Sequence, residues 1–178
     1  MSKKQLSALF FSSLIIWIVG AGLLPLLPVY AIQLGARPDI VGYYLAIVYS
    51  VLTGGTVVAG WLSDKLQQRK KLIIVAGTMG IPVVWQIGQA ANIWQLTVLT
   101  AMLWFMGGMI IALVIILTGL FADKTERGNF FGILSMTGPL GLIIGGLTHG
   151  PLADRWGYPT MFALLSLMWA LSPNSNSS

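Results

Sequence analysis

Ionisable residues gather in one segment of the chain, residues 60–72, which joins two long apolar runs. The segment holds one acid, Asp64, and four bases, Lys65, Arg69, Lys70 and Lys71. An acid at the end of a helix can pair with a nearby base such as Arg69, or face the positive N-terminus of another helix. Charge pairs of this kind need not add stability.

Residues that could carry a catalytic reaction are absent from the sequence. The chain has no cysteine, which rules out disulfides and cysteine-ligated metal sites, and it has one histidine, His149. None of its five acids lies inside an apolar run, where ionisable residues are usually functional. We therefore expect no catalytic site, no metal and no cofactor; an intramembrane enzyme would lack its catalytic set. His149, near a helix end, is interpreted as an interface residue, with proton coupling as the alternative.

The composition is that of a membrane protein. Hydrophobic residues make up 56% of the 178 positions, charged residues 8%, and the mean hydropathy is +0.83. A soluble domain carries about 25% charged residues. The stretches between the charged clusters are long enough to cross a bilayer, which takes about 20 residues. The net charge of +5 is interpreted as a mark of cytoplasmic loops and not as a nucleic-acid-binding surface.

The chain divides into six predicted transmembrane helices, because lipid-exposed backbone must satisfy its own hydrogen bonds and the runs lack the alternation of a barrel. The predicted spans are 6–30, 40–62, 72–91, 94–121, 129–147 and 158–171. With both termini in the cytoplasm, eight bases lie inside and two, Arg37 and Arg155, outside. We predict a multi-pass protein of the cytoplasmic membrane, with a six-helix domain over 1–172 and a polar tail at 173–178 that reads as a truncation product.

The segment 150–157 repeats the segment 60–67 at an offset of 90 residues. Glycine, leucine and aspartate recur at the same spacing, and a base follows each aspartate; the second copy carries Gly150, Asp154, Arg155 and Gly157. The second span thus corresponds to the fifth, so the six helices are predicted to form a 3+3 repeat. An odd number of helices per copy places the two copies on opposite sides of the membrane, which makes the repeat inverted.

The loop at 60–72 resembles the major facilitator superfamily of secondary transporters. Its spacing, G-x-L-x-D-K followed by R-K-K-L, is similar to the family's loop between the second and third helices. The family usually has glycine at the position of Gln67 and a base at the position of Gln68. Residues 22–30, followed by Leu34-Gly35, resemble the family's first span, and drug efflux members give the greatest likeness.

The predicted fifth span resembles the antiporter motif of this family. Gly138-Pro139 precedes Gly145-Gly146 with five residues between them, where the family has two. Gly141 and Gly145 also form a G-x-x-x-G face that allows close helix packing. The expected packing residues are Gly138, Pro139, Gly141, Gly145 and Gly146.

The resemblance implies one six-helix half of a twelve-helix fold that works by alternating access. In this family the acid and bases of the loop latch the two halves together in the outward-facing state. The gating residues would be Gly60, Leu62, Asp64, Lys65, Arg69 and Lys70, and a cytoplasmic charge network would add Asp123, Glu126 and Arg127. Proton-coupled drug antiporters commonly place an arginine where this chain has Leu103, so this half carries no evident proton relay.

Two functions follow. In the first, the chain is half of a secondary transporter of a small solute, including efflux of apolar compounds, within a lipid bilayer. Its partners are the substrate and a second six-helix half, either a missing C-terminal half or another copy. Substrate contacts are expected from Trp17, Tyr49, Trp104 and Met136, since such a lining favours apolar compounds. In the alternative, the chain transports nothing and binds another membrane protein through its glycine-rich helix faces.

Overall fold

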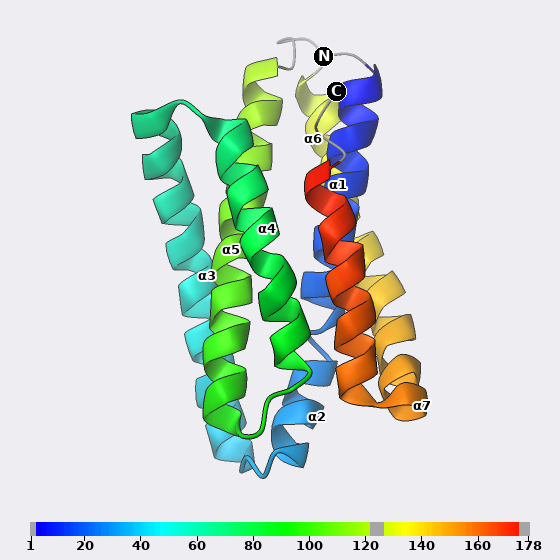
Figure 1. Cartoon of the computed structure of the whole chain (residues 1–178). Helices are drawn as coiled ribbons and strands as arrows, with labels where there is room; N and C mark the ends of the chain where they lie inside the picture. The colour runs from blue at the N-terminus through cyan, green and yellow to red at the C-terminus, as the bar shows by residue number, and fades with distance from the viewer. Residues whose placement is uncertain (1–2, 122–126, 175–178) are drawn as a thin grey trace.

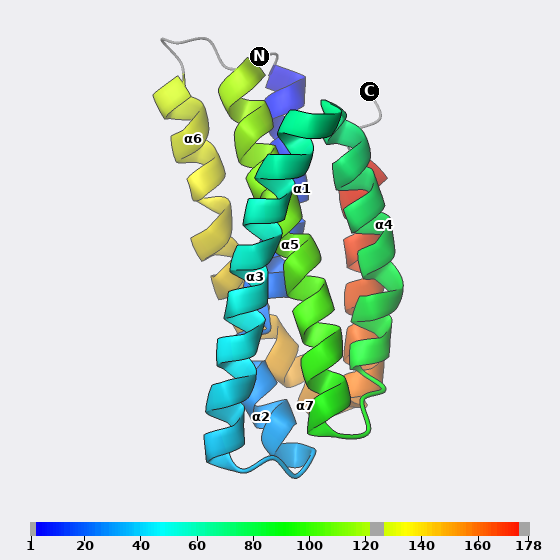
Figure 2. The same ribbon diagram turned by 90° about the vertical axis from the view of Figure 1, so that its left-hand side faces the viewer.

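The computed structural model describes residues 3–121 and 127–174, and these residues form helices and short turns without strands. The helices stand side by side in one bundle (Figure 1, Figure 2). They are α1 (Lys3–Gly22), α2 (Leu26–Gln33), α3 (Pro38–Leu66), α4 (Arg69–Ile87), α5 (Ile93–Phe121), α6 (Arg127–Ser135) and α7 (Thr137–Asn174). α7 consists of two limbs, 137–156 and 158–174, because Gly157 has non-helical backbone angles and the chain reverses there (Figure 1). The prediction of an all-helical fold is confirmed.

The first apolar run, predicted as one span over 6–30, is a bent pair of helices. α1 and α2 meet at an angle of 43° across a short break. Pro25 has no N–H to donate, and the amide of Leu26 bonds to the carbonyl of Leu23 at 3.0 Å. The carbonyl of Gly22 is thereby left without its usual helical partner, which explains the break.

The fifth run, predicted over 129–147, is also interrupted and extends further than predicted. It breaks at Met136, where Pro139 cannot donate to the carbonyl of Ser135. The hydroxyl of Thr137 donates instead to the carbonyl of Leu134 at 2.6 Å. The first limb of α7 then continues through 148–156, which the predicted spans leave as a loop, and ends only at Gly157.

The helix α3 begins and ends at recognisable signals. Pro38 occupies its first turn, where the fixed φ of proline suits the helix, and Asp39 complements the positive end. The guanidinium Nε of Arg37 donates to Oδ1 of Asp39 at 3.1 Å. The helix ends at Gln67, which adopts a left-handed conformation, and α4 starts two residues later.

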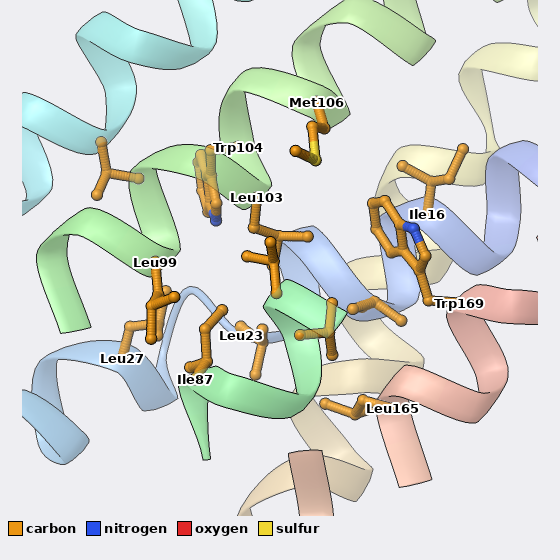
Figure 3. Packing of buried hydrophobic residues seen from close by; sticks show 14 of the residues in the cluster. Ile16, Leu23, Leu27, Ile87, Leu99, Leu103, Trp104, Met106, Leu165 and Trp169 are labelled. Atoms are coloured by element: carbon orange, nitrogen blue, oxygen red, sulfur yellow. The ribbon is translucent and has the colours of Figure 1, made fainter. Parts of the chain in front are cut away.

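Glycines set the closest contacts between helices. α1 packs along the first limb of α7, α3 along α5, and α4 against both α5 and the second limb of α7. A Cβ atom on Gly55 would lie 3.0 Å from the carbonyl carbon of Phe105, so α3 and α5 are nearly in backbone contact there. Small residues permit this approach. Membrane helices depend on such close packing, because lipid is as apolar as the helix surfaces and burial of apolar area does not drive the helices together. Figure 3 shows the core on either side of α5, from Leu99 and Leu103 to Leu165 of α7.

The helices are long and apolar enough to cross a membrane. Within the described residues, four of them meet this criterion, or five when the bent pair α1 and α2 is taken as one span. Many large apolar side chains are exposed on the outside of the bundle, among them Val57, Trp61, Trp94 and Leu147. Such a surface matches a hydrocarbon environment and would associate in water.

Candidate functional site

An apolar cavity of about 180 Å³ opens between four helices. Its wall carries four aromatic side chains, each from a different element: Trp17 of α1, Tyr49 of α3, Trp104 of α5 and Trp169 of α7. The remaining lining residues are glycine, alanine, leucine and isoleucine, so the described wall contains no charged group. A cavity of this kind holds apolar or aromatic molecules, since an engineered cavity of about 150 Å³ already accepts benzene.

Helix packing holds the aromatic rings of the cavity in place. Tyr49 and Trp104 make an edge-to-face contact, with ring centroids 5.1 Å apart and planes at 79°. The indole Nε1 of Trp169 donates to the carbonyl of Gly77 in α4 at 2.9 Å. Gly80 makes room for that ring, because a Cβ on Gly80 would lie 2.5 Å from Nε1 of Trp169. Figure 3 shows Trp104 and Trp169 projecting from α5 and α7 on opposite sides of Leu103.

The structure brings three of the four predicted cavity residues together. Trp17, Tyr49 and Trp104 line the cavity, whereas Met136 lies outside its lining and is 57% exposed. Met136 forms the turn between α6 and α7, and this break redirects its side chain. Trp169 was not predicted, because it lies in the last apolar run without any motif around it.

The pairing of Asp64 with Arg69, one of the two contacts that the sequence allowed, is not found among the described side chains. The guanidinium Nε of Arg69 donates to the hydroxyl of Ser63 at 2.7 Å, and Ser63 is fully buried. Asp64 is exposed, and among the described side chains the one ion pair is Arg37 with Asp39. Lys65 lies over the ring of Trp61, 4.8 Å from its centroid. Within the described part of the chain, the Asp64 carboxylate has no ion-pair partner, which leaves it open to a group outside that part.

The other predicted gating residues surround this exposed acid. Leu62 is half-buried and Lys70 is exposed. A Cβ atom on Gly60 would meet nothing within 4 Å, so the described part of the chain leaves space beside it. Asp123 and Glu126 of the predicted charge network lie outside the described residues, and Arg127 is the first residue of α6.

Gln67 adopts a backbone conformation that favours glycine. Its φ is 54°, and it is the one non-glycine residue with positive φ in the described chain. This is the position at which the resembled loop has glycine. A residue with a side chain pays about 1–2 kcal/mol when its backbone adopts the left-handed conformation. The glutamine at position 67, where the family has glycine, therefore strains the backbone locally.

Replacing Gln67 with glycine is expected to stabilise the bundle. Gln67→Gly removes the left-handed strain, partly offset by the greater freedom of glycine in the unfolded chain and by loss of the bond from Nε2 of Gln67 to the carbonyl of Asp64. We expect a net gain of about 0.5–1 kcal/mol, measured as resistance to thermal aggregation in detergent. Gln68→Gly, one residue on, is the control, because Gln68 has negative φ and should gain nothing.

The second copy of the repeated motif shares the burial pattern of the first but not its backbone turn. Gly157, 90 residues after Gln67, has φ 77° and ψ 160°, whereas Gln67 has φ 54° and ψ 15°. Ala153 is buried, as is Ser63 at the corresponding position, and Asp154 and Arg155 are exposed. A Cβ atom on Gly150, like one on Gly60, would meet nothing within 4 Å.

Among the predicted packing residues, two glycines of α7 touch α1 directly. A Cβ atom on Gly141 would lie 2.5 Å from Cβ of Trp17, and one on Gly145 would meet Gly22 and lie 2.7 Å from the carbonyl oxygen of Ile18. Gly138 makes only an ordinary contact with Trp17, Pro139 is exposed, and a Cβ on Gly146 would meet nothing within 4 Å. The α1–α7 contact at Gly141 and Gly145 also fixes Trp17 at the cavity.

Together, the long apolar helices and their lipid-like outer surface indicate an integral membrane protein, and the cavity between the helices is large enough for a small solute. Residues 9–173 match the family model of the Major Facilitator Superfamily, and the chain belongs to this family. The family assignment predicted from the motifs is confirmed.

Two similar proteins carry the same name. The chain is 33% identical over 144 residues to the multidrug resistance protein MdtG of Klebsiella pneumoniae (strain 342), covering 78% of this chain and 34% of that protein. It is 32% identical over 168 residues to MdtG of Proteus mirabilis (strain HI4320), covering 90% of this chain and 40% of that protein. The chain therefore spans less than half the length of these relatives.

Proposed function

We propose that this chain forms one six-span half of a secondary transporter that moves small apolar compounds by alternating access. The observation that carries the proposal is the uncharged cavity with one aromatic ring from each of four elements. Rings held at fixed angles provide broad apolar contact without demanding a particular hydrogen-bond pattern. The name of the relatives, multidrug resistance protein, supports export of several compounds.

The proposed architecture is a 3+3 inverted repeat over residues 1–172, with 173–178 as a tail. Two pairs of positions 90 residues apart support it: Ser63 and Ala153 are both buried, and Gly55 and Gly145 are both in close helix contact. In this arrangement the contact of α3 with α5 corresponds to that of α7 with α1. The excess of bases at 65–71 supports cytoplasmic termini in the cell membrane.

The working transporter requires a second six-helix half beside the cavity. The side chain of Tyr49, one wall of the cavity, is 45% exposed, so a neighbouring half could close over it. In this unit the exposed Asp64 would contact the second half as the gate latch, with Asp123, Glu126 and Arg127 as further charges on the same side. A practical complete unit is a chimera of this chain with the remaining segment of MdtG from Proteus mirabilis.

Substitution of Tyr49 tests the cavity as the substrate site. Tyr49→Ala removes one aromatic wall and is expected to weaken binding of an uncharged aromatic probe, such as a bromonaphthalene, about fivefold to tenfold. This corresponds to roughly 1–1.4 kcal/mol, as expected for one aromatic contact. Binding is measured by quenching of tryptophan fluorescence in the purified chain.

Tyr43→Ala is the matched control for this test. Tyr43 lies on the same helix and is 70% exposed, but it is not part of the cavity wall. Equal weakening by both substitutions, or by neither, would count against the cavity as the binding site.

The alternative function, binding of another membrane protein through glycine faces, has less support. Gly141 and Gly145, which form the G-x-x-x-G face, are already occupied by α1 within this chain.

A further inference from the structure

His149, the one histidine of the chain, is buried where α1 meets the first limb of α7. The residue is 1% exposed, and within the described structure neither ring nitrogen has a hydrogen-bond partner. The ring lies at the closest approach of the two helices. A Cβ atom on Gly22 would lie 2.8 Å from Cε1 of His149 and 2.5 Å from Cα of Gly145. Buried polar groups without partners are uncommon in folded proteins, so this one needs a physical reason.

The backbone of Gly22 lies against the imidazole, because a Cβ atom on Gly22 would lie 2.8 Å from Cε1 of His149. Gly22 is the last residue of α1 before the break to α2. Its carbonyl has no helical donor, because Pro25 lacks an N–H and the amide of Leu26 bonds to Leu23. The acceptor is therefore available to a ring N–H of His149, at the point where α1 can pivot.

The described side chains of α1 and α5 include no ionisable group. The hydroxyl of Tyr30 in α2 donates to the carbonyl of Ile87, and its ring stacks on Tyr158. On α7 itself Asp154 and Arg155 are exposed, and the bases of α4 lie in its first turn, at the end of the bundle away from Gly157 (Figure 1).

We propose that His149 is a proton-binding site whose protonation opens the contact between α1 and the first limb of α7. A neutral imidazole has one N–H donor, whereas an imidazolium has two. The Gly22 carbonyl can accept one of them. The second donor and the positive charge would remain buried without a partner, which is far more costly than burying the neutral ring. Movement of α1 about its break with α2 admits water to the ring and removes that cost. The proposal does not depend on the proposed transport function.

Two measurements on the purified full chain in detergent or nanodiscs test the proposal. The single histidine gives one pair of imidazole signals in ¹⁵N NMR, from Nδ1 and Nε2, so its protonation can be followed directly between about pH 8 and pH 4. Spin labels on cysteines at Phe11→Cys in α1 and Leu147→Cys in α7 report the distance between the helices. Both positions are exposed and the chain has no other cysteine. We expect the label distance to increase with the same pH midpoint as imidazole protonation.

His149→Gln keeps a polar side chain that cannot take up a proton in this range, and it should hold the label distance constant. An imidazole that stays neutral throughout, or one that becomes protonated while the distance stays fixed, would overturn the proposal. So would a pH-dependent distance change that persists in His149→Gln. If that variant fails to fold, the agreement or disagreement of the two midpoints in the chain that keeps His149 decides the question.

Discussion

Replacing Gly145 with leucine is expected to remove most of the folded protein, lowering stability by about 3 kcal/mol. The Cβ atom alone would meet the backbone of Gly22 and of Ile18, and neither can move without separating α1 from α7. Overpacking a close contact usually costs about 1–3 kcal/mol, and backbone atoms cannot give way as a flexible side chain can. The measurement is the temperature at which half of the purified chain stays monodisperse in detergent.

Gly146→Leu provides a matched control for this substitution. It changes the adjacent glycine of the same helix, where a Cβ meets nothing within 4 Å. Both substitutions improve helix propensity by about 1 kcal/mol, so the difference between them reports packing alone. Similar melting temperatures for the two variants would contradict the close α1–α7 contact.

Neutralising Asp64 is expected to reduce transport about tenfold without affecting folding. The acid is exposed and is not part of the one ion pair found among the described side chains, so Asp64→Asn removes no ion pair from that part of the chain. In the complete transporter the same change removes the charge that would latch this half to the second half. A tenfold effect corresponds to about 1.4 kcal/mol, within the range of a charge-assisted contact. The assay is efflux of an uncharged dye by the chimera in membrane vesicles.

Asp154→Asn, the corresponding substitution in the second copy of the motif, serves as the comparison for Asp64→Asn. The gating hypothesis assigns the latch to the first copy, so Asp154→Asn should reduce efflux less than Asp64→Asn. Full efflux activity in Asp64→Asn, with the protein present at normal level, would remove the gating role.

The sequence predicted the helical class and the family because both depend on features that are local in the chain. Apolar runs separated by charge clusters identify membrane helices whatever their packing. The spacing around Asp64 carried the family likeness. The ends of the helices were less predictable. The first limb of α7 runs to Gly157, although the composition of residues 148–156 favours a loop.

The cavity was predictable only in part, because its wall depends on the direction in which each helix faces. Trp17, Tyr49 and Trp104 lie on three different helices, and each of these helices turns its aromatic side chain toward the cavity. Met136 departs from this set because the break before Thr137 turns it outward. Trp169 joins the wall through its bond to Gly77 of α4, a contact between residues 92 positions apart that no local pattern contains.

The hydrogen bond of Arg69 could not be predicted for a similar reason. A base six residues after a serine carries no signal, yet the turn at Gln67 brings Arg69 back onto Ser63. The buried hydroxyl of Ser63 therefore accepts from Arg69, which was one of two groups that the sequence offered to Asp64.

Side-specific labelling of single cysteines tests the central claim, an inverted pair of three-helix repeats that crosses the membrane. The chain has no cysteine, so Lys65→Cys and Arg155→Cys each introduce one exposed thiol, at equivalent places in the two copies of the motif. A membrane-impermeant thiol reagent added to intact cells is predicted to modify the cysteine at 155 and to reach the one at 65 only after the membrane is opened. Modification of both from the same side would contradict the inverted repeat and, with it, the proposed transporter half.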